Sequence, residues 1–240
     1  MIEDEPVFFI AAPFGNYIKH PYGVNVIGTY TYKPRKSRFW TILQKPPAYR
    51  TVQGYGRGWT NKLGLPNPGI NHGLQKITPY NVLSIAEIER GDFRMMDTVI
   101  PEDQSLELNL SCPNLGKTLP WDDINIFFNN RREYLIAKVS PLTTPEEIQY
   151  IVNTGFKYIH FSNTLPVPKY GGLSGKALIP YTLRLIGLTR EISQTINIIA
   201  GGGVYDEETV HLYMDAGAQH ISLGSIFITK PYTAWRLLNR

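Results

Sequence analysis

Short apolar runs alternate with more polar segments along the whole chain. Eight of these runs are rich in β-branched, aromatic or leucine side chains, which is typical of strands. They cover residues 7–12, 24–32, 81–85, 106–110, 135–139, 158–161, 197–200 and 220–223. In the run 106–110, three leucines alternate with Glu107 and Asn109, so this strand is expected to have two unlike faces.

Helical patterns lie between the predicted strands. The segment 144–153 has the strongest start signal, with Thr144 at the N-cap, Pro145 at the first position and Glu147 at the third. Gly155 follows its end, as a glycine often does after a helix. Further helices are predicted over residues 68–77, 121–134, 177–192, 206–216 and 235–239.

This alternation of strands and helices predicts an α/β fold. Eight strands favour a single (β/α)8 TIM barrel over residues 1–240, and an open doubly wound sheet is the alternative. Closure is favoured because the strands are short and evenly distributed, and because polar residues follow the strand ends, where barrel sites are built. The proline- and glycine-rich stretch at about residues 35–60 is interpreted as an irregular excursion from the barrel and not as a second domain.

Composition narrows the class of protein. The 240 residues include one cysteine, which excludes an internal disulfide and an all-cysteine metal or iron–sulfur site within the chain. No histidine or carboxylate motif indicates a metal, and no apolar run is long enough to span a membrane. The net charge of +4 is mild, and the basic segment 33–38 is too short to predict nucleic-acid binding. The first residues match neither a secretion signal nor a transit peptide, so we expect a cytoplasmic protein.

The turn after the run 106–110 carries the single cysteine, Cys112, between Asn109 and Asn114. Two amides that both donate and accept hydrogen bonds, on either side of a thiol, suit a planar polar ligand. The alternative is an inert thiol that is packed as a small hydrophobic side chain.

Two consecutive strand ends are rich in glycine. Residues 201–203 are glycines after the run 197–200, and Gly224 and Ser225 follow the run 220–223. Glycines let backbone amides approach a phosphate, and barrels often bind phosphate after strands seven and eight. Two ordinary tight turns are the alternative interpretation, and the spacing lacks the dinucleotide-binding pattern GxGxxG.

Lys138 ends the fifth predicted strand, inside an apolar run. A lysine at such a place needs an anion or an acceptor, unless its side chain extends to the rim of the barrel. His160 also lies in an apolar strand, and we interpret it as a core residue with a hydrogen-bond partner.

The chain resembles the dihydroorotate dehydrogenase family in an ordered set of motifs. These are IGTYTYKP, NKLGLPNPG, LNLSCPN, AKVSP, SNT, GGLSGKAL and IIAGGGV followed by LGS, and they span roughly residues 11–228. The resemblance implies an FMN-bound barrel that oxidises (S)-dihydroorotate to orotate in de novo pyrimidine biosynthesis. It also implies a homodimer as one expected state of assembly.

The resemblance assigns roles to individual residues. Cys112 matches the base that removes the C5 proton while a hydride leaves C6 for flavin N5, and Lys138 matches the lysine near flavin N1. Substrate-binding positions are implied at Asn61, Leu63, Gly64, Leu65, Asn109, Asn114, Asn163 and Thr164. FMN-binding positions are implied at Ala12, Gly15, Gly28, Thr29, Ser84, Asn109, Lys138, Ser162, Asn163, Ser174, Gly175, Gly202, Gly203, Gly224 and Ser225.

Two other functions fit parts of the same pattern. A related flavin barrel that acts on dihydrouracil shares NLSCP, but it normally continues with histidine where this chain has Asn114, and it needs iron–sulfur cysteines. A binding module without chemistry would keep the glycines but would not need Cys112 or Lys138. The sequence leaves the electron acceptor open among fumarate, quinone, oxygen and the flavin of a partner.

Overall fold

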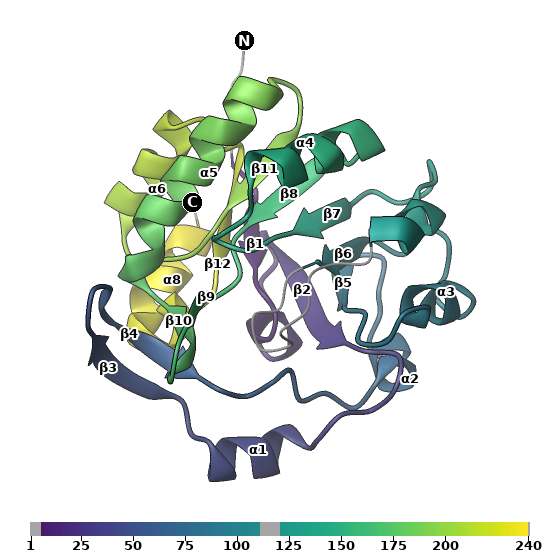
Figure 1. The fold of residues 1–240 in the computed structure, drawn as a ribbon, viewed down its shortest axis with the longest axis horizontal. Helices are drawn as coiled ribbons and strands as arrows, with labels where there is room; N and C mark the ends of the chain where they lie inside the picture. Colours follow the sequence, from purple (N-terminus) through teal and green to yellow (C-terminus); the bar gives the residue numbers. More distant parts are fainter. Residues whose placement is uncertain (1–5, 111–120, 240) are drawn as a thin grey trace.

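Eight parallel strands close into a barrel (Figure 1). The computed structural model describes residues 6–110 and 121–239. The barrel order is β1-β12-β11-β8-β7-β6-β5-β2. The strands are β1 Phe8–Ile10, β2 Gly23–Tyr30, β5 Asn81–Ile85, β6 Leu106–Asn109, β7 Leu135–Lys138, β8 Tyr158–Phe161, β11 Asn197–Ala200 and β12 His220–Leu223. Each strand coincides with one predicted run to within two residues at either end, so the TIM barrel is confirmed and the open sheet is excluded.

The helices surround the barrel strands on the left, upper, right and lower sides of Figure 1. α4 (Pro145–Thr154) starts with the predicted capping box, in which Thr144 Oγ1 accepts from Glu147 N at 3.3 Å and Glu147 Oε2 accepts from Thr144 N at 2.9 Å. The remaining α-helices are α1 Arg38–Gln44, α2 Ile70–Leu74, α3 Asp92–Asp97, α5 Ile179–Ile192, α6 Glu207–Asp215, α7 Ile226–Thr229 and α8 Pro231–Leu238. Within the described ranges, every helix is too short or too polar to cross a lipid bilayer.

The helix predicted over 121–134 is shorter than expected. A 3-10 helix covers only Trp121–Phe127. Beyond it, the side-chain oxygen of Asn129 accepts from the backbone N–H groups of Arg131 and Arg132 at 2.9 and 3.2 Å. Asparagine side chains that bond to nearby backbone in this way compete with helix formation, which explains the early end.

Successive side chains of each strand point to opposite sides of the barrel wall. Leu106, Leu108 and Leu110 belong to the large cluster that packs against the helices. A second cluster of Phe9, Val26, Val82, Ile136 and Ile199 fills the barrel interior. Two residues further along their strands, the same interior faces carry Gly28, Ser84 and Lys138. The interior therefore changes from apolar to polar toward the C-terminal ends of the strands, where barrel sites lie.

The excursion at about residues 35–60 is more regular than predicted. It contains α1 and a hairpin of β3 (Ala48–Val52) and β4 (Gly56–Asn61). β4 pairs with β10 (Gly171–Ser174) and β10 with β9 (Leu165–Val167), so a four-stranded antiparallel sheet stands beside the barrel (Figure 1). A Cβ on Gly58 would lie 2.4 Å from Ser174 O, so the close approach of β4 and β10 requires glycine there. The first four residues of the motif GGLSGK thus form the strand β10.

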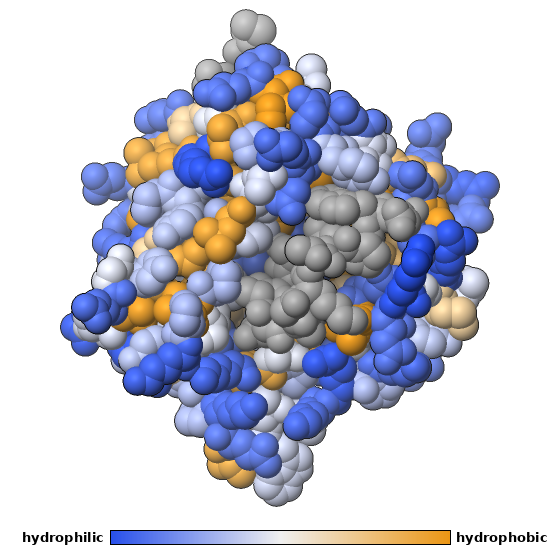
Figure 2. Space-filling model, viewed as in Figure 1, coloured by the Kyte–Doolittle hydropathy of each residue, from blue (hydrophilic) through white to orange (hydrophobic). Residues whose placement is uncertain are grey.

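Hydrophilic residues dominate the face of the molecule drawn in Figure 2, in the same view as Figure 1. Apolar residues gather over part of the helical layer and at the lower edge, where Figure 1 places α1. α1 exposes Phe39, Trp40 and Leu43 to solvent. The sheet and this helix therefore form an additional layer at one side of the barrel.

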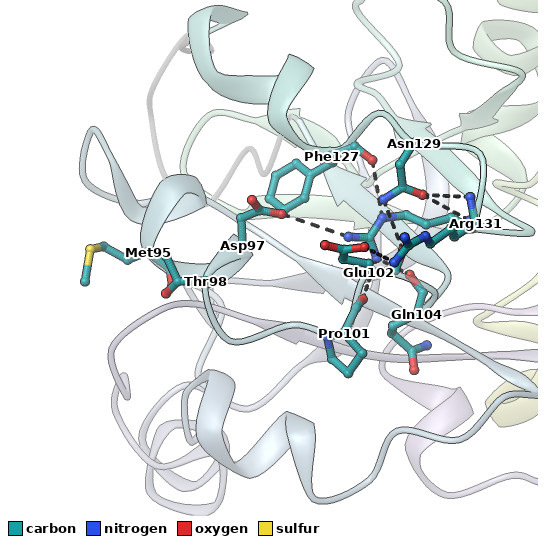
Figure 3. Close-up of polar contacts among 10 residues, drawn as sticks. Met95, Asp97, Thr98, Pro101, Glu102, Gln104, Phe127, Asn129 and Arg131 are labelled. Carbon is teal, nitrogen blue, oxygen red and sulfur yellow. Dashed lines mark hydrogen bonds and ion pairs between the residues drawn. The ribbon is translucent and has the colours of Figure 1, made fainter.

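Arg132 anchors the segment between the 3-10 helix and β7, and Figure 3 labels its partners Phe127, Pro101 and Gln104. Its side chain is buried, Nε donates to Phe127 O at 3.3 Å, and Nη1 donates to Pro101 O at 3.0 Å and to Gln104 O. Arg131, its neighbour in sequence, is exposed and pairs with the equally exposed Glu102. A single buried guanidinium thus joins the loops that lead into β6 and β7.

Candidate active site

A cavity of about 470 Å³ lies at the C-terminal ends of the barrel strands, where the antiparallel sheet meets the barrel. Its volume is in the range of small-molecule sites. Thirteen of the residues predicted from the sequence line it, namely Ala12, Asn61, Leu63, Lys138, Ser162, Asn163, Thr164, Ser174, Gly175, Gly202, Gly203, Gly224 and Ser225. These residues come from widely separated parts of the chain, and the fold brings them to one place.

Three further predicted residues lie behind the wall and reach it through hydrogen bonds. Asn163 Nδ2, in the wall, donates to Asn109 Oδ1 at 2.8 Å, and Asn109 Nδ2 donates to Thr29 Oγ1 at 3.3 Å. Thr29 Oγ1 lies 2.8 Å from Ser84 Oγ. Asn109, Thr29 and Ser84 therefore form a second layer that supports the cavity wall.

Four predicted residues are not part of the cavity wall. Gly15 and Gly28 are packing positions, because a Cβ would lie 2.4 Å from Val26 O at Gly15 and 2.5 Å from Ser84 O at Gly28. Gly64 lines a separate basic pocket, and its carbonyl accepts from Arg35 Nη2 at 3.1 Å. Leu65 has a positive φ of 59°, and its carbonyl accepts from Asn67 Nδ2 at 3.1 Å. Of the predicted segment 63–65, the structure thus places only Leu63 in the wall.

Cys112 and Asn114 lie outside the described residues. The strand that precedes them is well defined, since Leu110 N donates to Lys138 O at 2.9 Å. Cys112 follows Leu110 by two residues in the sequence. The role assigned to Cys112 from the sequence therefore stays a prediction.

Glu107 is a buried carboxylate that sequence reasoning did not assign to the site. Its side chain is fully buried, Lys138 Nζ lies 3.3 Å from Oε1, and His160 Nδ1 lies 2.6 Å from Oε2. Ser84 Oγ also donates to Oε1, at 2.9 Å. Burial alone would raise the pKa of Glu107, but Lys138 and His160 outweigh it and lower the pKa to about 2. The available signal was its place between two leucines, on the face that Asn109 shares.

His160 is a neutral partner in this cluster. Burial lowers its pKa, and the nearby Lys138 lowers it further against the opposing effect of Glu107, so the neutral imidazole is favoured. Because Glu107 is ionised and only accepts hydrogen bonds, Nδ1 must carry the ring proton and Nε2 a lone pair. The predicted hydrogen-bonded core histidine is confirmed, and its ring also lines the cavity.

The cavity wall also contains polar groups with no hydrogen-bond partner among the described residues. Ser162 Oγ and Trp59 Nε1 are buried without a hydrogen bond to the described residues. Gly202 and Gly203 have φ values of 78° and 89°, and a Cβ on Gly203 would lie 2.7 Å from Ile179 Cγ1. Such backbone can present N–H groups to a phosphate, while the hydroxyl and the indole suit a polar ring. The residues present therefore fit a flavin nucleotide. Sequence reasoning missed Trp59, which lies in the excursion interpreted as irregular.

The fold and the site define a (β/α)8-barrel enzyme whose cavity is lined by the glycine-rich loops after β11 and β12. The family model for dihydroorotate dehydrogenase matches residues 125–239. Over this C-terminal stretch the chain is therefore similar to the dihydroorotate dehydrogenase family.

Individual relatives of similar sequence or fold carry the same name. The chain is 26% identical over 258 residues to the dihydroorotate dehydrogenase B (NAD(+)) catalytic subunit of Thermotoga petrophila, across 94% of this chain and 92% of the relative. It is 28% identical over 222 residues to the protein of the same name from Malacoplasma penetrans, across 76% of this chain and 71% of the relative. The fold matches the crystal structure of the Eimeria tenella DHODH in complex with ferulenol with a TM-score of 0.72, at 19% identity, across 97% of this chain and 79% of that one.

Proposed function

We propose that this protein oxidises (S)-dihydroorotate to orotate in de novo pyrimidine biosynthesis, with bound FMN as the hydride acceptor. One observation carries the proposal. A single cavity brings the predicted substrate residues Asn61, Asn163 and Thr164 together with Lys138 and with the glycine turns predicted for FMN. The names of the relatives specify the same reaction class.

The cofactor would be held at two ends. Gly202, Gly203, Gly224 and Ser225 would bind the phosphate through backbone N–H groups and a hydroxyl. Lys138 would lie against the ring system, where a positive charge stabilises a reduced, anionic flavin. When bound, FMN supplies the acceptor for the hydride that leaves C6 of the substrate.

The substrate would be held by amides. Asn61 and Asn163 line the cavity, and Asn109 contacts Asn163 from behind. Orotate presents donors and acceptors along its edge, and a primary amide offers both. Thr164 adds a hydroxyl to the same part of the wall. The proposed contacts thus match the polarity of a pyrimidine ring that carries a carboxylate.

Cys112 would act as the general base that removes the C5 proton of the substrate. A free thiol has a pKa of about 8.5, which is close enough to neutral for a thiolate to act as a base. Loss of the C5 proton and of the C6 hydride leaves the C5=C6 double bond of orotate, so atoms and electrons balance. Asn114 would add a fourth amide to the substrate contacts.

The first test measures the flavin content of the protein and its reduction by the proposed substrate. The purified protein should be yellow, with flavin absorbance near about 450 nm. Anaerobic addition of dihydroorotate should bleach this absorbance, whereas dihydrouracil should leave it unchanged. Bleaching by dihydrouracil alone would favour the related pyrimidine-reducing activity, and a protein that takes up no FMN would contradict the proposal.

The electron acceptor follows from steady-state assays of the loaded protein with NAD+, fumarate, a quinone and oxygen. The two relatives carry NAD(+) in their names, which makes NAD+ the first acceptor to test. We also retain the cytoplasmic homodimer as a prediction, to be tested by cell fractionation and by light scattering of the loaded protein.

Gly203→Ala should weaken FMN binding by about tenfold, which corresponds to about 1.4 kcal/mol. The new Cβ would lie 2.7 Å from Ile179 Cγ1 and 3.0 Å from Gly175 O, on backbone with φ of 89°. The phosphate turn would have to shift, because left-handed backbone costs an alanine about 1–2 kcal/mol. Flavin fluorescence during titration of the apoprotein measures the affinity.

Gly187→Ala is the matched control for this substitution. Gly187 is exposed on α5, and a Cβ there meets nothing within 4 Å. Alanine favours a helix over glycine by about 1 kcal/mol, so stability should rise while the FMN affinity stays at the wild-type value. Equal FMN affinities of the two variants would exclude the 201–203 turn from the phosphate site.

A further inference from the structure

The proposed mechanism uses Lys138 but does not explain the carboxylate behind it. Glu107 is fully buried and ionised, and it does not line the cavity. Taking a charge pair out of water costs several kcal/mol per ion, so a buried ion pair is a poor device for stability alone. A purely structural residue at this position could be apolar, like the inner cluster one layer below. The charge of Glu107 therefore calls for a functional explanation.

The partners of Glu107 show where it acts. Lys138 and His160 both line the cavity, and each is held from behind by one oxygen of the Glu107 carboxylate. In the barrel register Glu107 lies beside Ser84, Asn109 beside Lys138, and Lys138 beside His160. Three strands, β5, β7 and β8, thus direct interior side chains at the one carboxylate that β6 carries.

A second branch leads from Glu107 to the proposed substrate side. Because an ionised carboxylate only accepts, Ser84 must spend its single hydroxyl proton on Glu107 Oε1. Thr29 then donates to Ser84, which leaves Thr29 Oγ1 to accept from Asn109 Nδ2. Asn109 Oδ1 in turn accepts from Asn163 Nδ2. The negative charge of Glu107 therefore sets which group donates and which accepts in each of these hydrogen bonds.

We propose that Glu107 is the positioning residue of this site, which holds the Lys138 ammonium at the cavity wall and orients the Asn109 amide. The inference rests on the proposed function, since it assigns Lys138 to the flavin. A lysine has a flexible four-carbon stem and a strongly hydrated head group. Without Glu107, the ammonium would turn to the rim or give up its charge, because an unpaired buried charge is unfavourable. In either case positive charge beside the flavin would be lost.

The test is the midpoint potential of FMN bound to the holoprotein, measured by equilibration with a redox dye and without substrate. Glu107→Gln keeps the shape of the side chain and removes the charge. We expect a more negative potential than in the wild type, because the reduced anionic flavin loses its positive neighbour. Glu87→Gln is the control, since Glu87 is a partly buried carboxylate that accepts from Gly91 N at 2.8 Å and lies outside the cavity wall. The midpoint potential of FMN in Glu87→Gln should equal that in the wild type.

A double-mutant cycle shows whether Glu107 acts through Lys138. In the Lys138→Met background, Glu107→Gln should lower the potential no further. The proposal is overturned if Glu107→Gln alone leaves the potential unchanged or makes it more positive. It is also overturned if the potential falls equally with and without Lys138.

Folding failure is also informative. The double variant has no buried charge from this pair, so it should fold even if Glu107→Gln does not, and that contrast would itself show the coupling. If neither variant folds, Glu107→Asp is measured instead. It withdraws the carboxylate by one methylene and should lower the potential slightly. An unchanged potential in Glu107→Asp would then overturn the proposal.

An unchanged potential in a holoprotein that dihydroorotate does reduce would refute this inference alone. A holoprotein that dihydroorotate does not reduce would refute the proposed substrate alone.

Discussion

Cys112→Ala should lower the rate of flavin reduction by dihydroorotate about 10³-fold, while FMN stays bound, because a positioned general base contributes about 10²–10⁴ to a rate. Removal of the C5 proton needs a base on the side of the substrate away from the ring that takes the hydride. Cys112 is the single cysteine of the chain, so no second thiol can replace it. The residues that line the cavity are untouched by the substitution, and FMN affinity should therefore stay within about twofold, a difference below 0.5 kcal/mol.

Anaerobic stopped-flow absorbance in a single turnover measures this rate without a contribution from the electron acceptor. In the wild type the rate should rise with pH as more of the thiol ionises, and this rise should be absent from Cys112→Ala. The change of the flavin spectrum on addition of orotate serves as a control for ligand binding. Retention of most of the wild-type rate would remove the role assigned to Cys112.

Arg132→Ala should lower the free energy of unfolding by about 3 kcal/mol, the magnitude expected when a buried charged group with several hydrogen bonds is removed. The carbonyl groups of Phe127, Pro101 and Gln104 would lose their donor (Figure 3). These carbonyl groups would be left without this donor in a buried place, because the Arg132 side chain is only 2% exposed. The loops into β6 and β7 would then be less firmly joined.

Urea denaturation followed by circular dichroism measures this change. Arg131→Ala is the matched control, because Arg131 is the next residue in the chain and its pair with Glu102 is exposed on both sides. Exposed ion pairs contribute little, so Arg131→Ala should denature at nearly the wild-type urea concentration. Similar losses for both arginines would mean that the buried hydrogen bonds of Arg132 do not contribute as argued.

The barrel was predictable because its signal is local. Each strand is an apolar run with its own boundaries, and the runs 81–85, 158–161, 197–200 and 220–223 match the observed strands at both ends. The antiparallel sheet was not predictable in the same way. β4 finds its partner β10 in a distant part of the chain, and the glycines of β10 contribute backbone hydrogen bonds and almost no side-chain pattern.

The candidate site was predictable where a motif carried it. The glycine turns, Lys138 and Asn163 all reach one cavity. Glu107 was missed because its role depends on three partners from other strands, and a single sequence shows none of these contacts. Gly64 and Leu65 were assigned by resemblance alone, and the hydrogen bonds of Arg35 and Asn67 hold that segment outside the wall.

The ladder between β4 and β10 has a practical consequence for protein engineering. It sets Ser174 opposite Trp59 and Gly172 opposite Asn61, so side chains proposed for the cofactor and for the substrate are carried by one pair of strands. A chimera that exchanges residues 48–61 with a homologue while keeping the native 165–175 would break this register. Transplanted specificity should therefore require both segments to be moved as a unit.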